Sequence, residues 1–264
     1  RLARLRLTIH PGAQARPVTE GLPFLGFIVF PAHRRLKRRK GIAFARRYAA
    51  LAKKSAARQK NASRKKILTE IAETCERVPE HPPRTFIEAV QFFYFIHLVR
   101  YLEYSTLGIG IRIDQLFGPY YEKDLKEGRI TKDETLGILQ LLWIKLNELG
   151  LVYSPTVSSV YGGVASLQAV TIGGTDENGK DVTNDLTYLT MEAARTLKII
   201  EPSIVLRMHN KTPNAVYEKA TDVIKTGIGY PSLFNDEALI PLFERWGVPT
   251  EDAKRYAVTG CVYI

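Results

Sequence analysis

Residues 167–208 read LQAVTIGGTDENGKDVTNDLTYLTMEAARTLKIIEPSIVLRM. The apolar, β-branched runs 167–172 and 203–208 predict two short strands, and residues 184–197 between them predict a helix. The polar run Asp176-Glu-Asn-Gly-Lys180 predicts a turn. Because helices alternate here with short strands, the sequence favours an α/β fold class.

Helices are predicted on both sides of this unit. Thr85 with Glu88 and Thr131 with Glu134 have the spacing of capping boxes, so helices are expected over 85–99 and 131–149. The other expected helices cover 48–76 as one or two segments, 114–125, 213–225 and 236–245, and a last one starts at Thr250. No repeat of fixed period is visible.

The composition excludes several classes of protein. With 264 residues, 45% of them hydrophobic, the chain can bury a core, which excludes a mainly disordered protein. Cys75 and Cys261 lie far apart in sequence, so we expect no disulfide framework, no metal site and a reducing, cytoplasmic location. No apolar run reaches the roughly 18 residues of a membrane span, and no targeting signal follows Arg1.

Positive charge is concentrated at the N-terminal end. Residues 1–66 hold 19 Lys and Arg against one acid, Glu20, whereas residues 67–264 hold 19 bases and 26 acids. The net charge of +11 is therefore the sum of a strongly basic segment and an acidic one, and these two segments suit different partners.

The basic segment itself combines a strand with a run of cations. Gly21–Pro31 predicts a short strand, and the run His33–Lys40 follows it. Such a run is an electrostatic footprint for phosphate backbones, and the alternative is a solvated or disordered basic tail. The candidate nucleic-acid-binding residues are Arg34, Arg35, Lys37, Arg38, Arg39 and Lys40.

Familiar catalytic motifs are not found in the rest of the chain. The sequence has no GxGxxG, P-loop, GxSxG or HExxH pattern, and His97 and His209 are isolated, as packed histidines usually are. The acid pairs at 236–237 and 251–252 stand at expected helix starts, where the helix dipole explains them.

Cys261 is the remaining candidate. It follows a predicted helix and Gly260 and precedes an apolar stretch, so its thiol is expected on a tight turn that enters a strand. A buried cysteine taken alone is usually a small apolar packing residue.

Ten short blocks then occur in order between residue 82 and the end of the chain. They are PPRTFIEAVQ (82–91), RIDQ (112–115), PYYEKD (119–124), LWIKLNE (142–148), TIGG (171–174), EPS (201–203), RMH (207–209), PSLFNDE (231–237), DAKRYA (252–257) and GCV (260–262). These blocks resemble the glycyl radical enzymes, the superfamily of pyruvate formate-lyase and its dehydratase and decarboxylase relatives. The resemblance implies that residues 46–264 form about the first half of a ten-stranded barrel, built from two antiparallel sets of five strands with helices outside.

The resemblance also implies a role for Cys261. In the family this cysteine lies on a loop inside the barrel and loses its hydrogen atom to a glycyl radical, and the thiyl radical then abstracts hydrogen from a small organic substrate. A lyase, dehydratase or formate acetyltransferase activity would follow, with cleavage of a C–C, C–O or C–N bond. The resemblance further implies a homodimer, no metal in the enzyme itself, and a separate activating enzyme that uses S-adenosylmethionine and an iron-sulfur cluster.

Three departures from the family pattern keep the reaction subtype and the substrate open. Dehydratases and decarboxylases usually read Gly-Cys-Val-Glu, whereas Tyr263 stands here in place of the glutamate, and an unperturbed phenol is a poor base at neutral pH. Pyruvate formate-lyase has two adjacent cysteines, and Cys261 has no cysteine neighbour. The glycine loop is absent, so these residues are expected to be inactive alone. The candidate substrate-binding residues are Tyr263, Phe234 and Asn235.

A second resemblance concerns the basic end. The runs LTIHPG (7–12), GLPFLGFIVFP (21–31) and HRRLKRRKGIAF (33–44) resemble the region just after the palm of bacterial reverse transcriptases of the retron and retroelement kind. The metal-binding Tyr-x-Asp-Asp of that family is absent, so this segment cannot polymerise. The alternative function is therefore a nucleic-acid-binding segment over 1–45, with the join near 41–47 produced by a chimera of gene fragments.

Overall fold

The computed structural model describes residues 22–24, 27–29, 34–36, 38–103, 108–149, 156, 159 and 168–260. The chain divides into two compact units, Arg1–Glu76 and Arg77–Ile264. In the described part of the chain, no helix is long and apolar enough to cross a membrane.

The first unit contains a small antiparallel sheet of three strands. They are β1 (Leu22–Phe24), β2 (Phe27–Val29) and β3 (Arg34–Leu36), in the order β1-β2-β3. The single strand predicted over 21–31 is wrong, because this segment holds both β1 and β2. The two strands pair antiparallel, with Phe24 opposite Phe27.

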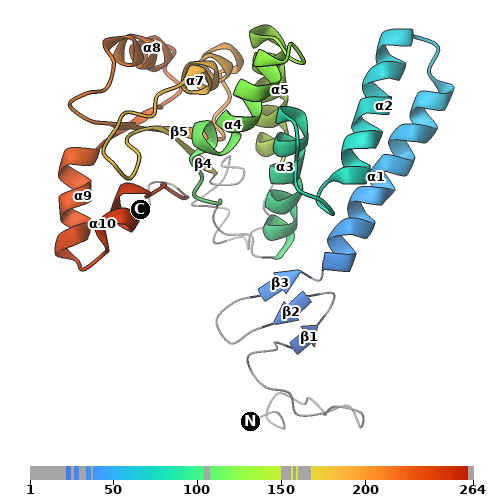
Figure 1. Cartoon of the computed structure of the whole chain (residues 1–264), viewed down its shortest axis with the longest axis horizontal. Helices are drawn as coiled ribbons and strands as arrows, with labels where there is room; N and C mark the ends of the chain where they lie inside the picture. The colour runs from blue at the N-terminus through green and yellow to red at the C-terminus, as the bar shows by residue number, and fades with distance from the viewer. Residues whose placement is uncertain are drawn as a thin grey trace. The chain divides into compact units, whose positions relative to one another are not determined.

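Two helices complete the first unit (Figure 1): α1 (Arg38–Arg58) and α2 (Ala62–Arg77). The sequence predicted one or two helices over 48–76, and α1 starts ten residues earlier. It therefore runs through the predicted domain boundary between residues 45 and 46. One face of α1 is buried through alanines at helical spacing, and the Lys53 ammonium lies 2.5 Å from the Glu76 carboxylate of α2. The buried alanines are Ala45, Ala49, Ala52 and Ala56.

The second unit is built on a parallel sheet. Its strands are β4 (Ala169–Gly173), β5 (Ser203–Met208) and β6 (Ser232–Asn235), in the order β4-β5-β6. Helix α7 (Asp185–Leu197) connects β4 to β5, and α8 (Asn214–Ile224) connects β5 to β6. The predicted α/β class is confirmed. Three parallel strands are consistent with part of a barrel, and the predicted total of ten stays a prediction.

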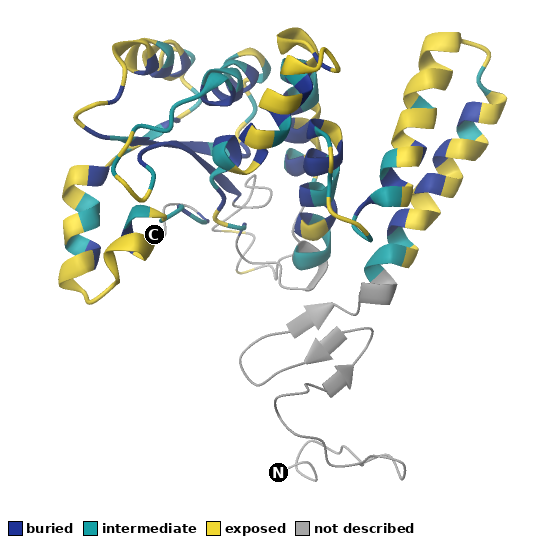
Figure 2. Cartoon of the chain, in the orientation of Figure 1, coloured by how far each residue is buried: buried dark blue, intermediate teal, exposed yellow. Residues whose placement is uncertain are grey.

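Helices of the second unit cover one face of this sheet (Figures 1 and 2). They are α3 (Phe86–Glu103), α4 (Ile113–Lys126), α5 (Lys132–Asn147), α7 and α8. The strand residues that enter the main core with them are Val170, Ile172, Ile204 and Leu206. Trp143, in the C-terminal half of α5, is fully buried in the same core.

The opposite face of the sheet carries different side chains, because successive strand residues point to opposite sides. Its residues are Ala169, Thr171, Val205 and Arg207, all of them buried. We call this the Arg207 face. The last helices, α9 (Asp236–Arg245) and α10 (Thr250–Lys254), precede the segment that returns to it.

The predicted capping boxes form to different extents. At α5, the Thr131 hydroxyl accepts from the Glu134 N–H at 3.2 Å and the Glu134 carboxylate accepts from the Thr131 N–H at 2.8 Å. At α3, Thr85 accepts from the Glu88 N–H, but the Glu88 carboxylate accepts from the Arg84 N–H. The predicted box at 85–88 is therefore half formed, because the adjacent arginine takes the carboxylate.

The complete box at α5 gives a direct test of the local structure. Thr131→Ala should lower the free energy of unfolding by about 1 kcal/mol, because the first turn loses its side-chain acceptor. Thr131→Ser, which keeps the hydroxyl, should change it by far less. Urea unfolding of the 264-residue chain measures both, and equal stabilities for the two variants would contradict the capping assignment.

Candidate active site

The segment that leads to Cys261 lies on the Arg207 face. Cys261 and Tyr263 themselves lie outside the described residues, and Gly260 is the last residue that the structure describes. The placement of the site must therefore be built from residues 254–260. This segment follows α10 and comes back across the strands.

Three contacts fix the second half of this segment. The Val258 N–H donates to the Thr171 hydroxyl at 3.0 Å, and the Val258 side chain is buried in a small cluster with Ala169 and Val205. The Thr259 hydroxyl donates to the Gly108 carbonyl. Because strands β4 and β5 contribute two of these contacts, the chain is held against the sheet immediately before Cys261.

A buried ion pair holds the first half. Arg207, at the end of β5, is fully buried and meets the Asp236 carboxylate in a bidentate contact, with Nε to Oδ1 at 2.9 Å and Nη2 to Oδ2 at 2.8 Å. Asp236 is the first residue of α9 and is also buried. Bidentate arginine pairs fix orientation as well as charge, so the guanidinium plane is set by the carboxylate.

The remaining guanidinium hydrogens reach the returning segment. Arg207 Nη1 donates to the Tyr256 carbonyl and Nη2 donates to the Lys254 carbonyl, both at 3.0 Å. The guanidinium carbon lies 3.9 Å from the centre of the Tyr256 ring, and the Tyr256 hydroxyl donates to Asp236 at 2.7 Å. Burial, with the neighbouring carboxylate, raises the pKa of Tyr256, so the phenol stays a hydrogen-bond donor.

Two glycines make room for Arg207. Gly173 and Gly174 both have positive φ, at 69° and 82°. A Cβ atom on Gly174 would lie 2.7 Å from Arg207 Nε, and one on Gly173 would lie 2.8 Å from the Arg207 carbonyl oxygen. The pair therefore has a steric function at the end of β4, where a side chain at either position would collide with Arg207.

Arg112 supports the glycine turn from the other side. Its guanidinium donates to the Gly173 carbonyl at 2.8 Å and to the Thr175 carbonyl at 3.0 Å. Burial lowers the pKa of Arg112, with the nearby charge of Arg207 as a second cause. Asp114 accepts from the Gly173 N–H at 2.8 Å, and its complete burial raises the pKa of its carboxyl group.

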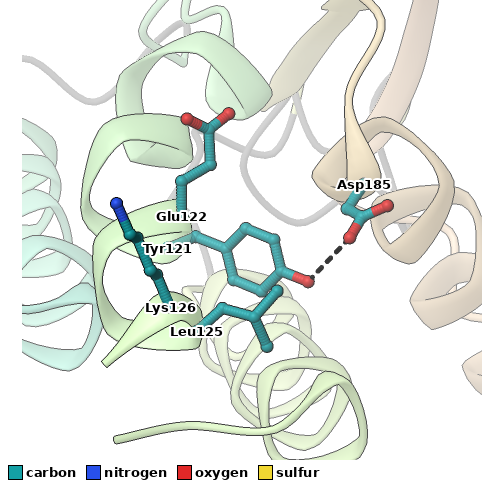
Figure 3. A pocket seen from close by; sticks show the side chains of 5 residues that line it. All are labelled: Tyr121, Glu122, Leu125, Lys126 and Asp185. Carbon is teal, nitrogen blue, oxygen red and sulfur yellow. Dashed lines mark hydrogen bonds between the residues drawn. The ribbon is translucent and has the colours of Figure 1, made fainter. Parts of the chain in front are cut away.

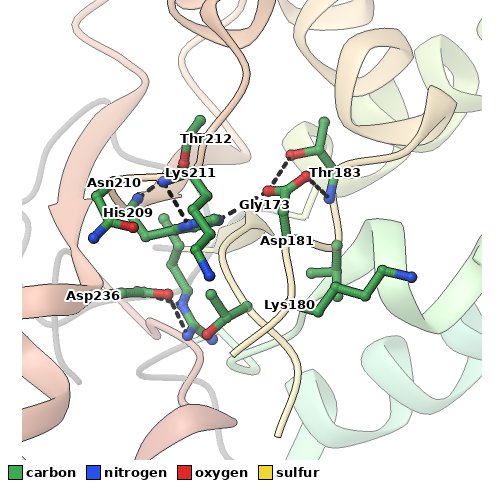
Figure 4. Close-up of polar contacts among 12 residues, drawn as sticks. Gly173, Lys180, Asp181, Thr183, His209, Asn210, Lys211, Thr212 and Asp236 are labelled. Atoms are coloured by element: carbon green, nitrogen blue, oxygen red, sulfur yellow. Dashed lines mark hydrogen bonds and ion pairs between the residues drawn. The ribbon is translucent and has the colours of Figure 1, made fainter. Parts of the chain in front are cut away.

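His209 and Asp181 form a second polar pair beyond β5 (Figure 4). His209 Nε2 lies 2.9 Å from Asp181 Oδ1, and Nδ1 accepts from the Lys211 N–H. Nε2 therefore carries the hydrogen and donates it to the carboxylate. Asp181 also accepts from the Thr183 hydroxyl, so the pair ties the loop before α7 to the end of β5. His209 is buried, as an isolated packed histidine is expected to be.

The surface also has a shallow depression of about 280 Å³ between α4 and α7 (Figure 3). Its lining includes Tyr121 and Asp185, whose hydroxyl and carboxylate are 3.1 Å apart. None of the predicted site residues lines it. Across residues 38–103, 108–149 and 168–260, no three His, Cys, Asp or Glu side chains gather as metal ligands.

The other predicted site residues have different surroundings. Phe234 pairs in register with Arg207 and packs against the cluster around Val258, so it lies on the Arg207 face. Asn235 is exposed, and its side chain accepts from the Glu237 N–H as the N-cap of α9. Of the basic candidates, Arg34 and Arg35 lie in β3 and Arg38, Arg39 and Lys40 in α1, while Lys37 and all six side chains lie outside the described residues.

The sequence interpretation missed the residues that organise this site. Asp236 was explained by the helix dipole, and it does stand in the first turn of α9, but its burial and its pairing with Arg207 give it a second role. The available signal was Arg207 itself, a charged residue that ends the apolar run 203–206. A charge in such a strand requires a partner.

Comparison with known proteins gives a consistent family relationship. Residues 38–264 match the model of the pyruvate formate lyase-like family. The chain is 41% identical over 223 residues to an isethionate sulfite-lyase of Nitratidesulfovibrio vulgaris, covering 83% of this chain and 27% of that protein. It is 35% identical over 218 residues to a (2S)-3-sulfopropanediol dehydratase of Klebsiella oxytoca, covering 82% and 26%.

Solved structures agree. The glycerol-bound form of the B12-independent glycerol dehydratase from Clostridium butyricum aligns with a TM-score of 0.80 and 36% identity, over 84% of this chain and 28% of that one. A glycyl radical enzyme from Archaeoglobus fulgidus aligns with a TM-score of 0.80 and 35% identity, over 84% and 29%. The chain thus spans about 27% of the length of the curated relatives that it matches. The match starts at residue 38, and the comparisons give no support to a reverse transcriptase segment or to a chimera.

The steric role of Gly174 can be isolated by a matched substitution. Gly179 has a similar φ of 74°, but nothing lies within 4 Å of a Cβ atom built there. Both Gly174→Ala and Gly179→Ala should lose stability, because alanine disfavours the positive φ of these positions. Only Gly174→Ala should also displace the Arg207 side chain. We expect Gly174→Ala to be more destabilising by about 1–3 kcal/mol in urea unfolding. Equal losses would contradict the packing role.

Proposed function

This chain belongs to the pyruvate formate lyase-like family, and from this membership we propose that residues 38–264 carry the thiyl-forming part of a glycyl radical lyase or dehydratase. The glycine loop that stores the radical would lie outside these 264 residues. The observation that carries the proposal is the segment 254–260, which is pinned on the Arg207 face directly before Cys261.

In the proposed reaction, Cys261 transfers hydrogen atoms, each a proton with one electron, and it is unchanged after a complete cycle. Its S–H bond breaks as the glycyl Cα radical takes the hydrogen atom, which leaves a thiyl radical. The sulfur then takes a hydrogen atom from a substrate C–H bond and returns one to the product radical after the substrate bond has broken. The thiyl radical that re-forms takes the hydrogen atom back from the glycine, which restores the glycyl radical. Such chemistry needs shielding from water and from stray hydrogen donors more than it needs charge.

The substrate class is proposed from the names of the relatives. Isethionate, sulfopropanediol and glycerol are short molecules with a hydroxyl-bearing carbon, and the relatives are named as a lyase and dehydratases acting on them. We propose a substrate of this kind, from which Cys261 abstracts the hydrogen of the carbinol carbon. We propose Phe234 as a residue that contacts the substrate, because it lies on the Arg207 face near the segment that leads to Cys261.

Tyr263 restricts the subtype. It stands where dehydratases and decarboxylases of this family usually carry a glutamate, and an unperturbed phenol is a poor base at neutral pH. A phenol can donate a proton or a hydrogen bond to a leaving group. We therefore propose that Tyr263 donates a hydrogen bond or a proton to the leaving group. It would not remove a proton from the substrate.

The direct test compares the activated full-length gene product with its Cys261→Ser variant. The serine O–H bond is too strong to be broken by a glycyl radical, so we expect the glycyl doublet in electron paramagnetic resonance to persist while turnover of isethionate, glycerol or 1,2-propanediol is lost. Cys261→Ser should unfold at the same temperature as the unaltered protein, since the change is nearly isosteric. Turnover by the variant at equal radical content would remove Cys261 from the mechanism.

A second proposal concerns the basic surface of α1 and α2. Residues 38–69 contain twelve Lys and Arg and no acid. Nine of these bases are exposed: Arg46, Arg47, Lys53, Lys54, Arg58, Lys60, Arg64, Lys65 and Lys66. Among them, Lys53 forms an ion pair with Glu76 and Lys66 with Glu70. We propose that this surface, together with the basic candidates at 34–40, attracts the phosphate backbone of a nucleic acid.

Salt dependence tests this second proposal. For roughly four phosphate contacts, the affinity of the 264-residue chain for a fluorescent RNA or DNA should fall about a hundredfold between 50 and 200 mM salt. Lys54→Glu with Arg58→Glu should weaken binding at fixed salt, whereas the matched reversal Lys123→Glu with Lys126→Glu on α4 should not. Equal effects of the two reversals, or tighter binding to anionic vesicles than to RNA and DNA, would contradict it.

A further inference from the structure

The chain approaches Cys261 through seven residues that are fixed at four points. Arg207 holds the carbonyls of Lys254 and Tyr256, the Thr171 hydroxyl holds the N–H of residue 258, and the Thr259 hydroxyl reaches the Gly108 carbonyl. Residues 254, 256 and 258 are therefore each held by a hydrogen bond of the backbone. The fourth hydrogen bond, from the Thr259 side chain, lies two residues before Cys261.

Arg207 makes two of these four hydrogen bonds, and its own side chain is held in place. Arg207 is fully buried, meets Asp236 through two hydrogen bonds and lies 3.9 Å from the Tyr256 ring. Gly174 leaves no free space beside the guanidinium, since a single added carbon would lie 2.7 Å from Nε. The position of the guanidinium is thus determined by the sheet and by α9.

The last described residue of this segment, Gly260, has an unusual backbone conformation. Gly260 is buried and has a φ of 60°, a conformation that side-chain-bearing residues rarely adopt. A glycine at this point allows a backbone conformation that a residue with a side chain would adopt only under strain. The orientation of the thiol therefore depends on how firmly residues 254–259 are held.

We propose that Arg207, Asp236 and Tyr256 form a clamp that positions the Cys261 thiol for hydrogen-atom transfer, an inference that rests on the proposed function. The three are positioning residues: Arg207 binds the approach segment, Asp236 orients the guanidinium, and Tyr256 joins both through its ring and its hydroxyl. Transfer of a hydrogen atom requires the reacting atoms to be within about 3–3.5 Å, so a displacement of 1 Å costs a large factor in rate.

Two substitutions loosen the segment 254–260 without opening a cavity, one within the clamp and one at the separate contact with β4. Tyr256→Phe keeps the ring over Arg207 and removes the hydroxyl that donates to Asp236 at 2.7 Å. Thr171→Val is nearly isosteric and removes the hydroxyl that accepts from residue 258. The matched control is Tyr121→Phe, which removes a hydroxyl bonded to Asp185 at 3.1 Å on the helix-covered side.

The first measurement needs no radical. In the unactivated full-length protein, each loosening variant should raise the rate of Cys261 alkylation by iodoacetamide about tenfold, the effect expected for one lost hydrogen bond, as read by peptide mass spectrometry. Cys75 serves as an internal control, because burial raises the pKa of its thiol to about 11 and keeps it unreactive. An unchanged alkylation rate in Tyr256→Phe would overturn the clamp, whatever the rate in Thr171→Val.

The second measurement uses the activated enzyme. With the glycyl doublet intact, the loosening variants should lose about tenfold in kcat with little change in KM, and the deuterium isotope effect on the substrate C–H bond should rise. Tyr121→Phe should leave all three unchanged. A fall in kcat that disappears on cooling, in step with the recovery of folded protein, would show a purely structural role and would overturn the proposal. If the unaltered protein gives no doublet, the proposed function fails and the alkylation rates alone decide the clamp.

Discussion

The second unit depends on one buried charge pair, Arg207 with Asp236. A guanidinium without access to water must be neutralised and must have its donors satisfied, or its burial would cost several kcal/mol. Asp236 supplies the charge, and the carbonyls of residues 254 and 256 accept two of the remaining hydrogens. Because the charge and the N–H donors of Arg207 need partners, β5, the start of α9 and the segment after α10 are brought together.

This constraint explains features that are unrelated in sequence. The Gly173-Gly174 turn gives the guanidinium its space, and Arg112 holds that turn by its carbonyls. Tyr256 covers the cation with its ring and orients the carboxylate with its hydroxyl. The glycine turn, Arg112 and Tyr256 each restrict the movement of the charge pair. The segment that leads to Cys261 is therefore held rigidly.

Local patterns predicted the elements well and the site poorly. The strand at 203–208, the helix at 236–245 and the Thr131 capping box depend on near neighbours, and all three formed as expected. β6 was missed because it has four residues, two of them exposed, and its last residue also caps α9. The charge pair joins residues 29 apart and the contact with Tyr256 joins residues 49 apart, and such pairings depend on topology that no local pattern contains.

A structure of the full-length protein with a bound hydroxylated substrate is the most direct test of the central claim. The account predicts the Cys261 sulfur enclosed beside the Arg207 face, about 3–4 Å from the hydroxyl-bearing carbon, with the segment 254–260 held as it is here. A sulfur that faces bulk solvent, with no enclosed space beside it and the substrate bound elsewhere, would contradict it.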